Sequence, residues 1–179
     1  MSDVPNTLPS THCFVTTHDQ AGNAIFYDKT EEVKMKAMGP AFFDVLFATN
    51  TFPHDFENDK DVRGFLALDG VIPVSMPGGT VVRMVDLAPG QASPMHRTTS
   101  LDYGVVLEGE IVLVLDDMDK GPRRVMKRGD VSIQRATNHA WVNESTNWCR
   151  MLYVLVDAKP VKIDGQELPD VGEIEMPGQ

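Results

Sequence analysis

The second half of the chain consists of short apolar segments separated by turn residues at close, regular spacing, and this pattern restricts the fold more than any other feature. The predicted strands are 80–88, 93–98, 102–109, 110–116, 123–128, 131–134, 139–143 and 148–158. Such spacing is typical of an antiparallel sandwich or barrel. Segments 110–116 and 151–158 are apolar on both faces, whereas 131–134 alternates and should turn one face to water or to a cavity.

The first half is less regular. Residues 13–19 and 24–27 flank a turn and predict a hairpin, while 41–50 fits either a strand or a short helix. Residues 51–78 mix Pro, Gly, Asp and Asn with isolated hydrophobic residues, which predicts a long excursion over the surface or across the mouth of a barrel. Near the C-terminus only 161–164 resembles an edge strand, and we expect the rest of the tail to be loosely held.

Size and charge exclude several classes of protein. A chain of 179 residues fits one domain, and a net charge of -10 disfavours nucleic acid and anionic membranes as partners. The sequence shows no apolar run near the roughly 18 residues of a spanning helix and no signal peptide, so we expect a cytoplasmic protein. Cys13 and Cys149 are far apart in sequence and predict neither a disulfide nor a zinc site. No P-loop, dinucleotide fingerprint or nucleophilic triad is evident.

Two segments of the second half resemble the sequence motifs of the cupin family. The first motif, G-x5-H-x-H-x3-E-x6-G, is matched in spacing by Gly90, His96, Thr98, Asp102 and Gly109. The second motif resembles residues 129–143, which begin with Gly-Asp and end with His139 and Asn143. The similarity covers about residues 79–157. More narrowly, the chain is similar to small single-domain cupins that accompany polyketide or other secondary-metabolite pathways.

The resemblance implies an all-β fold, the cupin double-stranded β-helix or jelly-roll barrel, with an N-terminal strand extension. Residues 1–78 would then supply N-terminal strands and an excursion that covers the pocket, 79–157 the barrel core, and 158–179 an edge strand and tail, all within one structural domain. Single-domain cupins commonly pair, so we also expect a homodimer in which the N-terminal strands cover an open sheet edge of the neighbouring subunit.

The match is incomplete at the metal-ligand positions of the family. The resemblance places His96, Thr98, Asp102 and His139 there, so that a threonine and a shorter carboxylate stand where a histidine and a glutamate are usual. The remaining set, His96, Asp102 and His139, could hold Fe, Mn or Zn with open positions. We expect either no cofactor or a weakly held divalent metal.

Strand alternation explains why polar residues enter an apolar strand. His96 and Thr98 share one face, as do His139, Trp141 and Asn143. If that face is the barrel interior, these residues line a cavity for a small molecule.

The predicted roles follow from residue chemistry. His96, His139 and Asp102 are the candidate catalytic residues, although Asp102 could also be only a turn residue. The candidate substrate-binding residues are Thr98, Tyr103, Trp141 and Asn143. Thr98 could instead be structural, and Tyr103 could be either pocket wall or hydroxyl donor.

Three functions remain open at this point. The first is a lyase or isomerase that catalyses dehydration, decarboxylation, cyclisation or double-bond migration of an apolar, polyketide-like substrate by histidine acid-base chemistry. The second is a metal-dependent oxygenase that uses the His/Asp/His set as ligands. The third is a ligand-binding cupin without catalysis. Loss of two of the four ligand positions favours the first.

Overall fold

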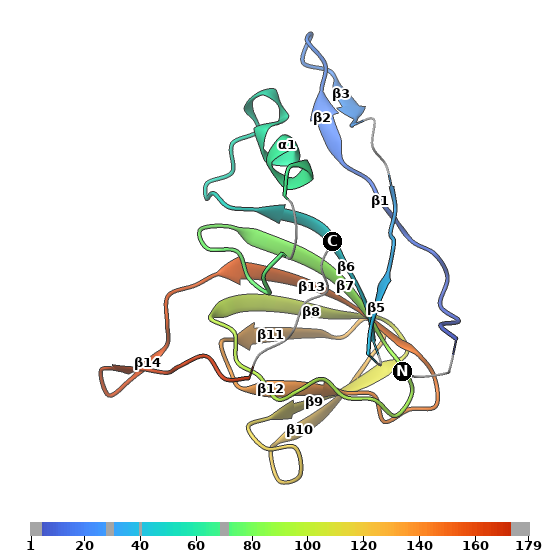
Figure 1. Ribbon diagram of the computed structural model, residues 1–179, viewed down its shortest axis with the longest axis vertical. Coiled ribbons are helices and arrows are strands. Elements are labelled where there is room, and N and C mark those ends of the chain that lie inside the picture. Colours follow the sequence, from blue (N-terminus) through green and yellow to red (C-terminus); the bar gives the residue numbers. More distant parts are fainter. Residues whose placement is uncertain (1–4, 28–30, 40, 69–71, 173–179) are drawn as a thin grey trace.

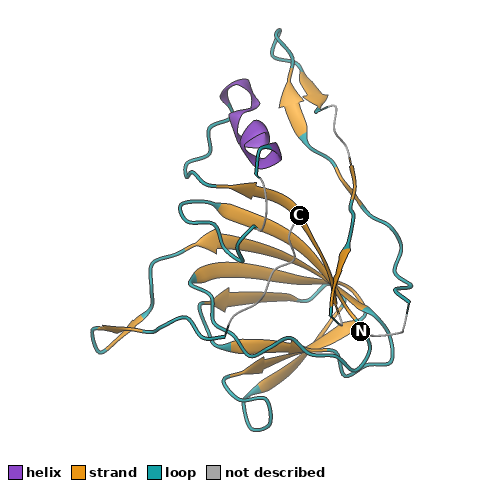
Figure 2. Ribbon diagram, viewed as in Figure 1, coloured by secondary structure: helices purple, strands orange, loops and turns teal. Residues whose placement is uncertain are grey.

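The computed structural model describes residues 5–27, 31–39, 41–68 and 72–172 (Figure 1). Two antiparallel sheets face each other and form a barrel (Figure 2). The larger sheet has the order β11 (Val131–Arg135), β8 (Ser100–Glu108), β13 (Cys149–Asp157), β7 (Thr80–Leu87), β6 (Ala41–Thr49) and β5 (Lys36–Met38). The smaller sheet has the order β10 (Arg123–Lys127), β9 (Glu110–Leu115) and β12 (His139–Val142). The predicted all-β barrel is thereby confirmed.

Most predicted strands are found where the sequence places them, and the ambiguous segment 41–50 forms a strand. The exception is 93–98, which makes only isolated bridges, with His96 opposite His139 and Arg97 opposite Val171. Pro94 has no backbone N–H to donate to a ladder, which accounts for the irregular backbone here. This irregular segment carries one of the two motif histidines into the barrel wall.

The barrel core is divided between two apolar clusters. One consists of buried residues from both sheets: Ala41, Leu87, Val106, Ile111, Met126, Trp141, Cys149 and Met151. The other brings Ala48, Val81 and Leu155 of the larger sheet against Ile72 of the excursion, with Phe65 and Val74 packed alongside. Burial of these side chains fixes the excursion on the larger sheet.

The excursion at 51–78 contains a helix that the sequence did not predict. A short 3-10 turn, η1 (Glu57–Asp59), leads into α1 (Lys60–Leu66), and Val62 is the buried residue of this helix. A helix of seven residues presents too few turns for its periodicity to be recognised. After the helix, the carbonyl groups of Ile72, Pro73 and Val74 accept hydrogen bonds from the Arg83 guanidinium.

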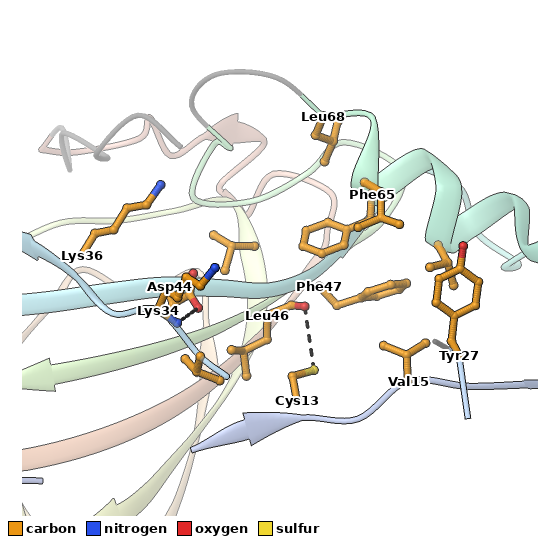
Figure 3. A pocket seen from close by; sticks show the side chains of 14 residues that line it. Cys13, Val15, Tyr27, Lys34, Lys36, Asp44, Leu46, Phe47, Phe65 and Leu68 are labelled. Carbon is orange, nitrogen blue, oxygen red and sulfur yellow. Dashed lines mark hydrogen bonds between the residues drawn. The ribbon is translucent and has the colours of Figure 1, made fainter. Parts of the chain in front are cut away.

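The N-terminal strands form an arm beside the barrel (Figure 1). The strand β1 (His12–Cys13) pairs with β4 (Glu31–Glu32), and the predicted hairpin is present as β2 (Thr16–His18) and β3 (Ala24–Phe26). A side pocket of about 290 Å³ lies between this arm, β6 and α1. Figure 3 shows Cys13, Phe47 and Phe65 around it. Pairing of this arm with a second subunit stays a prediction.

The C-terminal segment is held more firmly than expected. The strands β14 (Lys162–Ile163) and β15 (Gln166–Glu167) pair with each other, so 161–164 forms a local hairpin and not an edge strand of the barrel. Beyond them, the Arg97 N–H donates to the Val171 carbonyl at 2.7 Å, and the Thr99 hydroxyl donates to Asp170 at 2.8 Å. Residues 173–179 lie outside the described residues. Across the described ranges, no helix has the length and apolar character needed to cross a membrane.

Candidate active site

A cavity of about 520 Å³ lies between the two sheets, within the range of about 300–1,000 Å³ typical of small-molecule sites. Its wall is mostly apolar and includes Phe43, Val85, Ile111 and Met151. Polar groups enter it from both sheets and from the 92–98 segment. These are Arg83, Ser93, His96, Thr98, Asp102, Gln134, His139 and Tyr153. The structure therefore brings together all three predicted catalytic residues, together with Thr98 and Trp141, around one cavity.

His96 and His139 face each other across a bridge between the 92–98 segment and β12. The two residues exchange both backbone hydrogen bonds, at 2.9 and 2.8 Å, and their ring centroids are 4.2 Å apart. Each Nδ1 lies 2.9 Å from a backbone carbonyl oxygen, that of Pro94 for His96 and that of Thr137 for His139. A carbonyl oxygen only accepts, so in each neutral ring Nδ1 carries the hydrogen and Nε2 keeps the lone pair.

Burial keeps both rings neutral. Desolvation lowers the pKa of His96, although the Nδ1 bond to Pro94 acts in the opposite direction. Desolvation, and then the neighbouring charge of His96, lowers the pKa of His139 to about 4. A proton on one ring therefore disfavours a second proton on the other. Among the described residues, the Asp102 carboxylate makes no hydrogen bond or ion pair with either imidazole, so it does not raise the pKa of either ring.

Asp102 is the third residue of β8 and is buried in the cavity wall. Its Oδ1 accepts a hydrogen bond of 2.5 Å from the Ser100 hydroxyl, two residues away on the same face of the strand. Desolvation raises the pKa of Asp102 to about 6, and the bond from Ser100 opposes this rise. Asp102 can therefore hold or release a proton near neutral pH.

Four polar residues of the cavity were not predicted from the sequence, namely Arg83, Ser93, Gln134 and Tyr153. Gln134 of β11 lies opposite Asp102 in the strand register, and Tyr153 of β13 lies opposite Gly104. A Cβ atom at Gly104 would be 3.1 Å from the Tyr153 ring and 2.6 Å from the Ser132 hydroxyl, so glycine leaves the space for that ring. Only the alternation of 131–134 hinted that one face of this strand lines a cavity.

Two predicted substrate-binding residues lie elsewhere. Tyr103 is 40 % exposed and does not line the cavity, because its neighbour Asp102 faces inward and alternation turns Tyr103 outward. Asn143 is fully buried, and its Nδ2 donates to the carbonyls of Leu87 and Asn147 at 2.9 and 2.8 Å. It follows the last residue of β12, where the alternation that would have placed it beside Trp141 ends. Both expectations are corrected.

Comparisons with known proteins place this architecture in a family. Residues 83–155 match the model of the cupin domain. A "Phomopsin biosynthesis cluster protein C'" of Diaporthe leptostromiformis is 44% identical over 167 residues, which are 91% of this chain and 87% of that protein. The chain belongs to the cupin family.

Two further relatives match over most of the chain. An "Oryzines biosynthesis cluster protein J" of Aspergillus oryzae is 41% identical over 93% of this chain and 94% of that protein. A "Cupin-domain-containing oxidoreductase fogC" of Aspergillus ruber is 36% identical over 86% of this chain and 76% of that protein. The similarity therefore includes the N-terminal arm and the excursion as well as the barrel.

The metal-ligand positions of this cupin do not form a three-ligand centre. Among the residues that the structure describes, no three His, Cys, Asp or Glu side chains are grouped so as to hold a metal ion. The imidazoles of His96 and His139 are adjacent, but the Asp102 carboxylate is bonded to Ser100 and lies beside Gln134. The grouping of two imidazoles departs from the predicted set of His96, Asp102 and His139, and weak binding of Fe, Mn or Zn at this site stays a prediction.

Proposed function

We propose that this cupin is an enzyme of a secondary-metabolite pathway that acts as a lyase or isomerase on a small, largely apolar substrate. The reaction would be a dehydration, decarboxylation, cyclisation or double-bond migration. The names of the relatives, which refer to phomopsin and oryzine biosynthesis clusters, support the biosynthetic setting. The mostly apolar cavity supports the choice of substrate, since a polyketide-like molecule offers apolar surface and a few oxygen atoms.

The main observation in support of the proposal is the pair of histidines, His96 and His139, in the cavity wall. Backbone carbonyls of Pro94 and Thr137 hold the Nδ1 hydrogens, so each ring offers an unprotonated Nε2 without any rearrangement. A general base has to be unprotonated and fixed in place before the substrate binds. Both conditions hold for His96 and His139.

The two histidines take different roles in this proposal. His96 accepts the proton from a substrate carbon, and its positive charge then disfavours a second proton on the neighbouring His139. The proton then returns from His96 to another carbon in an isomerisation, or to a leaving oxygen in an elimination. Asp102, whose pKa is about 6, is a second group in the same cavity that can donate a proton.

Oxidoreductase activity is the second candidate, because a relative 36% identical over 86% of this chain carries that name. In this chain, His96 and His139 are the two side chains that could share a metal ion there. A metal would supply a site for binding and activating dioxygen. The absence of a third grouped protein ligand makes proton transfer the better supported chemistry.

One experiment separates these possibilities without knowledge of the natural substrate. The protein is incubated in D2O under an ¹⁸O2 atmosphere with a panel of β,γ-unsaturated and β-hydroxy ketones, and the products are read by mass spectrometry. We expect deuterium on carbon and no ¹⁸O. His96→Ala should slow incorporation about 10²–10⁴-fold, whereas His18→Ala, which removes an exposed histidine of the arm, should leave it unchanged.

The outcomes that oppose the proposal are distinct. Products that contain ¹⁸O and vanish on treatment with a chelator would establish the oxidoreductase instead. Binding of panel members without incorporation of either label would favour a ligand-binding cupin. Unchanged deuterium incorporation in both His96→Ala and His139→Ala, with the variants folded, would remove the pair from the chemistry.

A further inference from the structure

Gln134 places an amide side chain in a buried position, where a polar group without a hydrogen-bond partner costs free energy. It lies in β11 with 5% of its surface exposed, and it lines the cavity opposite Asp102 in the β8–β11 register. Its neighbours along the strand, Ile133 and Arg135, are exposed, so alternation fixes the amide toward the barrel interior.

Only one end of this amide has a partner. The Thr137 hydroxyl donates to Oε1 at 2.7 Å. The Gln134 Nε2 is buried, and no hydrogen-bond partner for it exists among the described residues. In this arrangement Oε1 receives the hydroxyl hydrogen of Thr137, and Nε2 is left with its two hydrogens.

A buried donor without an acceptor costs about 1–3 kcal/mol, and most such groups in proteins are satisfied. The cost is avoided when a ligand oxygen occupies the cavity. An apolar residue of similar size would fill the same wall without that cost. Retention of an amide here therefore indicates an acceptor that arrives with the substrate.

We propose that Gln134 Nε2 donates a hydrogen bond to a carbonyl oxygen of the substrate, so that the substrate class is that of enolisable ketones or related carbonyl compounds. This inference rests on the proposed lyase or isomerase function and makes Gln134 a substrate-binding residue of the same cavity. It complements the base His96, since a carbonyl group makes the hydrogens on its adjacent carbon acidic.

The atoms balance in a single proton transfer. The C–H bond next to the carbonyl breaks, its proton goes to Nε2 of His96, and the electron pair moves through carbon to the carbonyl oxygen. The resulting enolate oxygen carries more negative charge than the ketone oxygen did, so the hydrogen bond from Gln134 strengthens as the reaction proceeds. Return of the proton to carbon then closes the cycle, and no oxidant or reductant is needed.

The test measures binding and does not depend on turnover. The probes are 2-acetylnaphthalene and 2-ethylnaphthalene, which match in shape and differ by the carbonyl oxygen. Titration of ¹⁵N-labelled protein follows the Gln134 side-chain amide, which is assigned by its disappearance in Gln134→Met. We expect wild type to bind the ketone about tenfold more tightly than the hydrocarbon, with a downfield shift of the amide hydrogens for the ketone alone.

Two variants make the test specific. Gln134→Met keeps the volume and removes the donor, so its preference for the ketone should fall to about onefold. Gln166→Met makes the same change at an exposed position of β15, outside the cavity, and should keep the preference. Equal binding of the two probes by wild type, retention of the preference by Gln134→Met, or no binding of either probe at millimolar concentration would overturn the inference.

The result is separable from the proposed function. His96→Ala should keep the preference for the ketone while losing deuterium incorporation, because it removes the base and leaves the donor. Preference for the ketone without deuterium incorporation in wild type would retain Gln134 as an oxygen-binding residue and reject the lyase or isomerase. Deuterium incorporation without a preference for the ketone would retain the lyase or isomerase and reject Gln134 as an oxygen-binding residue.

Discussion

Two buried polar clusters lie on opposite faces of the larger sheet, and they differ in how completely their polar atoms are partnered. On the outer face, Arg150 donates to both oxygens of Asp86 at 2.6 Å. Residues of the N-terminal segment complete this cluster, since Arg150 also donates to the Pro9 carbonyl at 2.6 Å and Asn6 donates to Asp86 at 2.7 Å. We refer to Asp86, Arg150, Asn6 and Pro9 as the outer network.

The second cluster lines the cavity on the inner face and consists of Asp102, Gln134, His96 and His139, which we refer to as the cavity cluster. Not all of its polar atoms have hydrogen-bond partners. Gln134 has a buried nitrogen with no acceptor among the described residues, and the Nδ1 bonds of His96 and His139 leave each Nε2 to the cavity. The outer network fastens the N-terminal segment to the barrel, and its atoms have nothing further to bind. The cavity cluster has hydrogen-bonding capacity that the protein does not use. Unused capacity in a buried site is what distinguishes a candidate ligand site from a structural one.

The largest expected effect is on the outer network. Asp86→Ala leaves the Arg150 guanidinium buried without its carboxylate, so we expect a loss of about 3–5 kcal/mol in the free energy of unfolding. Urea denaturation measures this. The control is Asp55→Ala, which breaks the exposed pair with Lys60 and should change stability little.

Replacement of both partners tests the reason for that loss. Asp86→Leu combined with Arg150→Met removes both charges together and should cost less than Asp86→Ala alone, because no unpaired charge remains buried. If Asp86→Ala costs no more than the Asp55 control, the outer network does not hold the structure and the contrast between the two faces fails.

The second prediction concerns the pH dependence of stability, to which two groups of the cavity cluster contribute with opposite signs. The folded pKa of His139 is lowered to about 4, so the unfolded state binds more protons between pH 6.5 and 4 and acid destabilises the protein through this group. The folded pKa of Asp102 is raised to about 6, so between pH 6 and 4 the folded state binds more protons and acid stabilises it. In wild type the two contributions partly cancel.

Replacement of one group reveals the pH-dependent contribution of the other to the free energy of unfolding. Relative to wild type, Asp102→Asn should lose unfolding free energy as the pH falls from 6.5 to 4.5, and His139→Gln should gain it. Each difference is bounded by about 1.4 kcal/mol per unit of pKa shift. Urea denaturation of the three proteins at both pH values measures it, and differences of the same sign in the two variants would contradict the assigned pKa directions.

The sequence predicts the barrel and the histidine pair because both depend on local patterns. Strand spacing and the two motifs place His96 and His139 on facing segments without knowledge of the register. Gln134 was missed because its position beside Asp102 depends on how β11 pairs with β8, and that pairing has no local signature. The outer network joins Arg150 to Pro9 across 141 residues, which no periodicity can show.

The errors have equally local causes. Tyr103 was assigned to the pocket for its chemistry, although the inward position of Asp102 already turned it outward. Asn143 was assigned by alternation, which applies only within a strand, and β12 ends at Val142. Alternation restricted to residues within a strand would have excluded Asn143, and alternation applied to the neighbours Asp102 and Tyr103 of β8 would have excluded Tyr103.

The smallest expected effect is at Gln134 and is the sharpest test of the contrast between the faces. Gln134→Met removes a buried nitrogen that has no partner among the described residues, so the transfer gain of an apolar side chain offsets the one lost bond to Thr137. We expect the free energy of unfolding to change by less than about 1 kcal/mol. The matched control is Asn143→Leu, an amide to apolar change in an equally buried position. There the carbonyls of Leu87 and Asn147 lose their donor and Ser145 loses its acceptor, so a larger loss follows. Urea denaturation of both variants in parallel gives the comparison. Equal losses would mean that Gln134 is as firmly built into the fold as Asn143, and its nitrogen could no longer be regarded as reserved for a ligand.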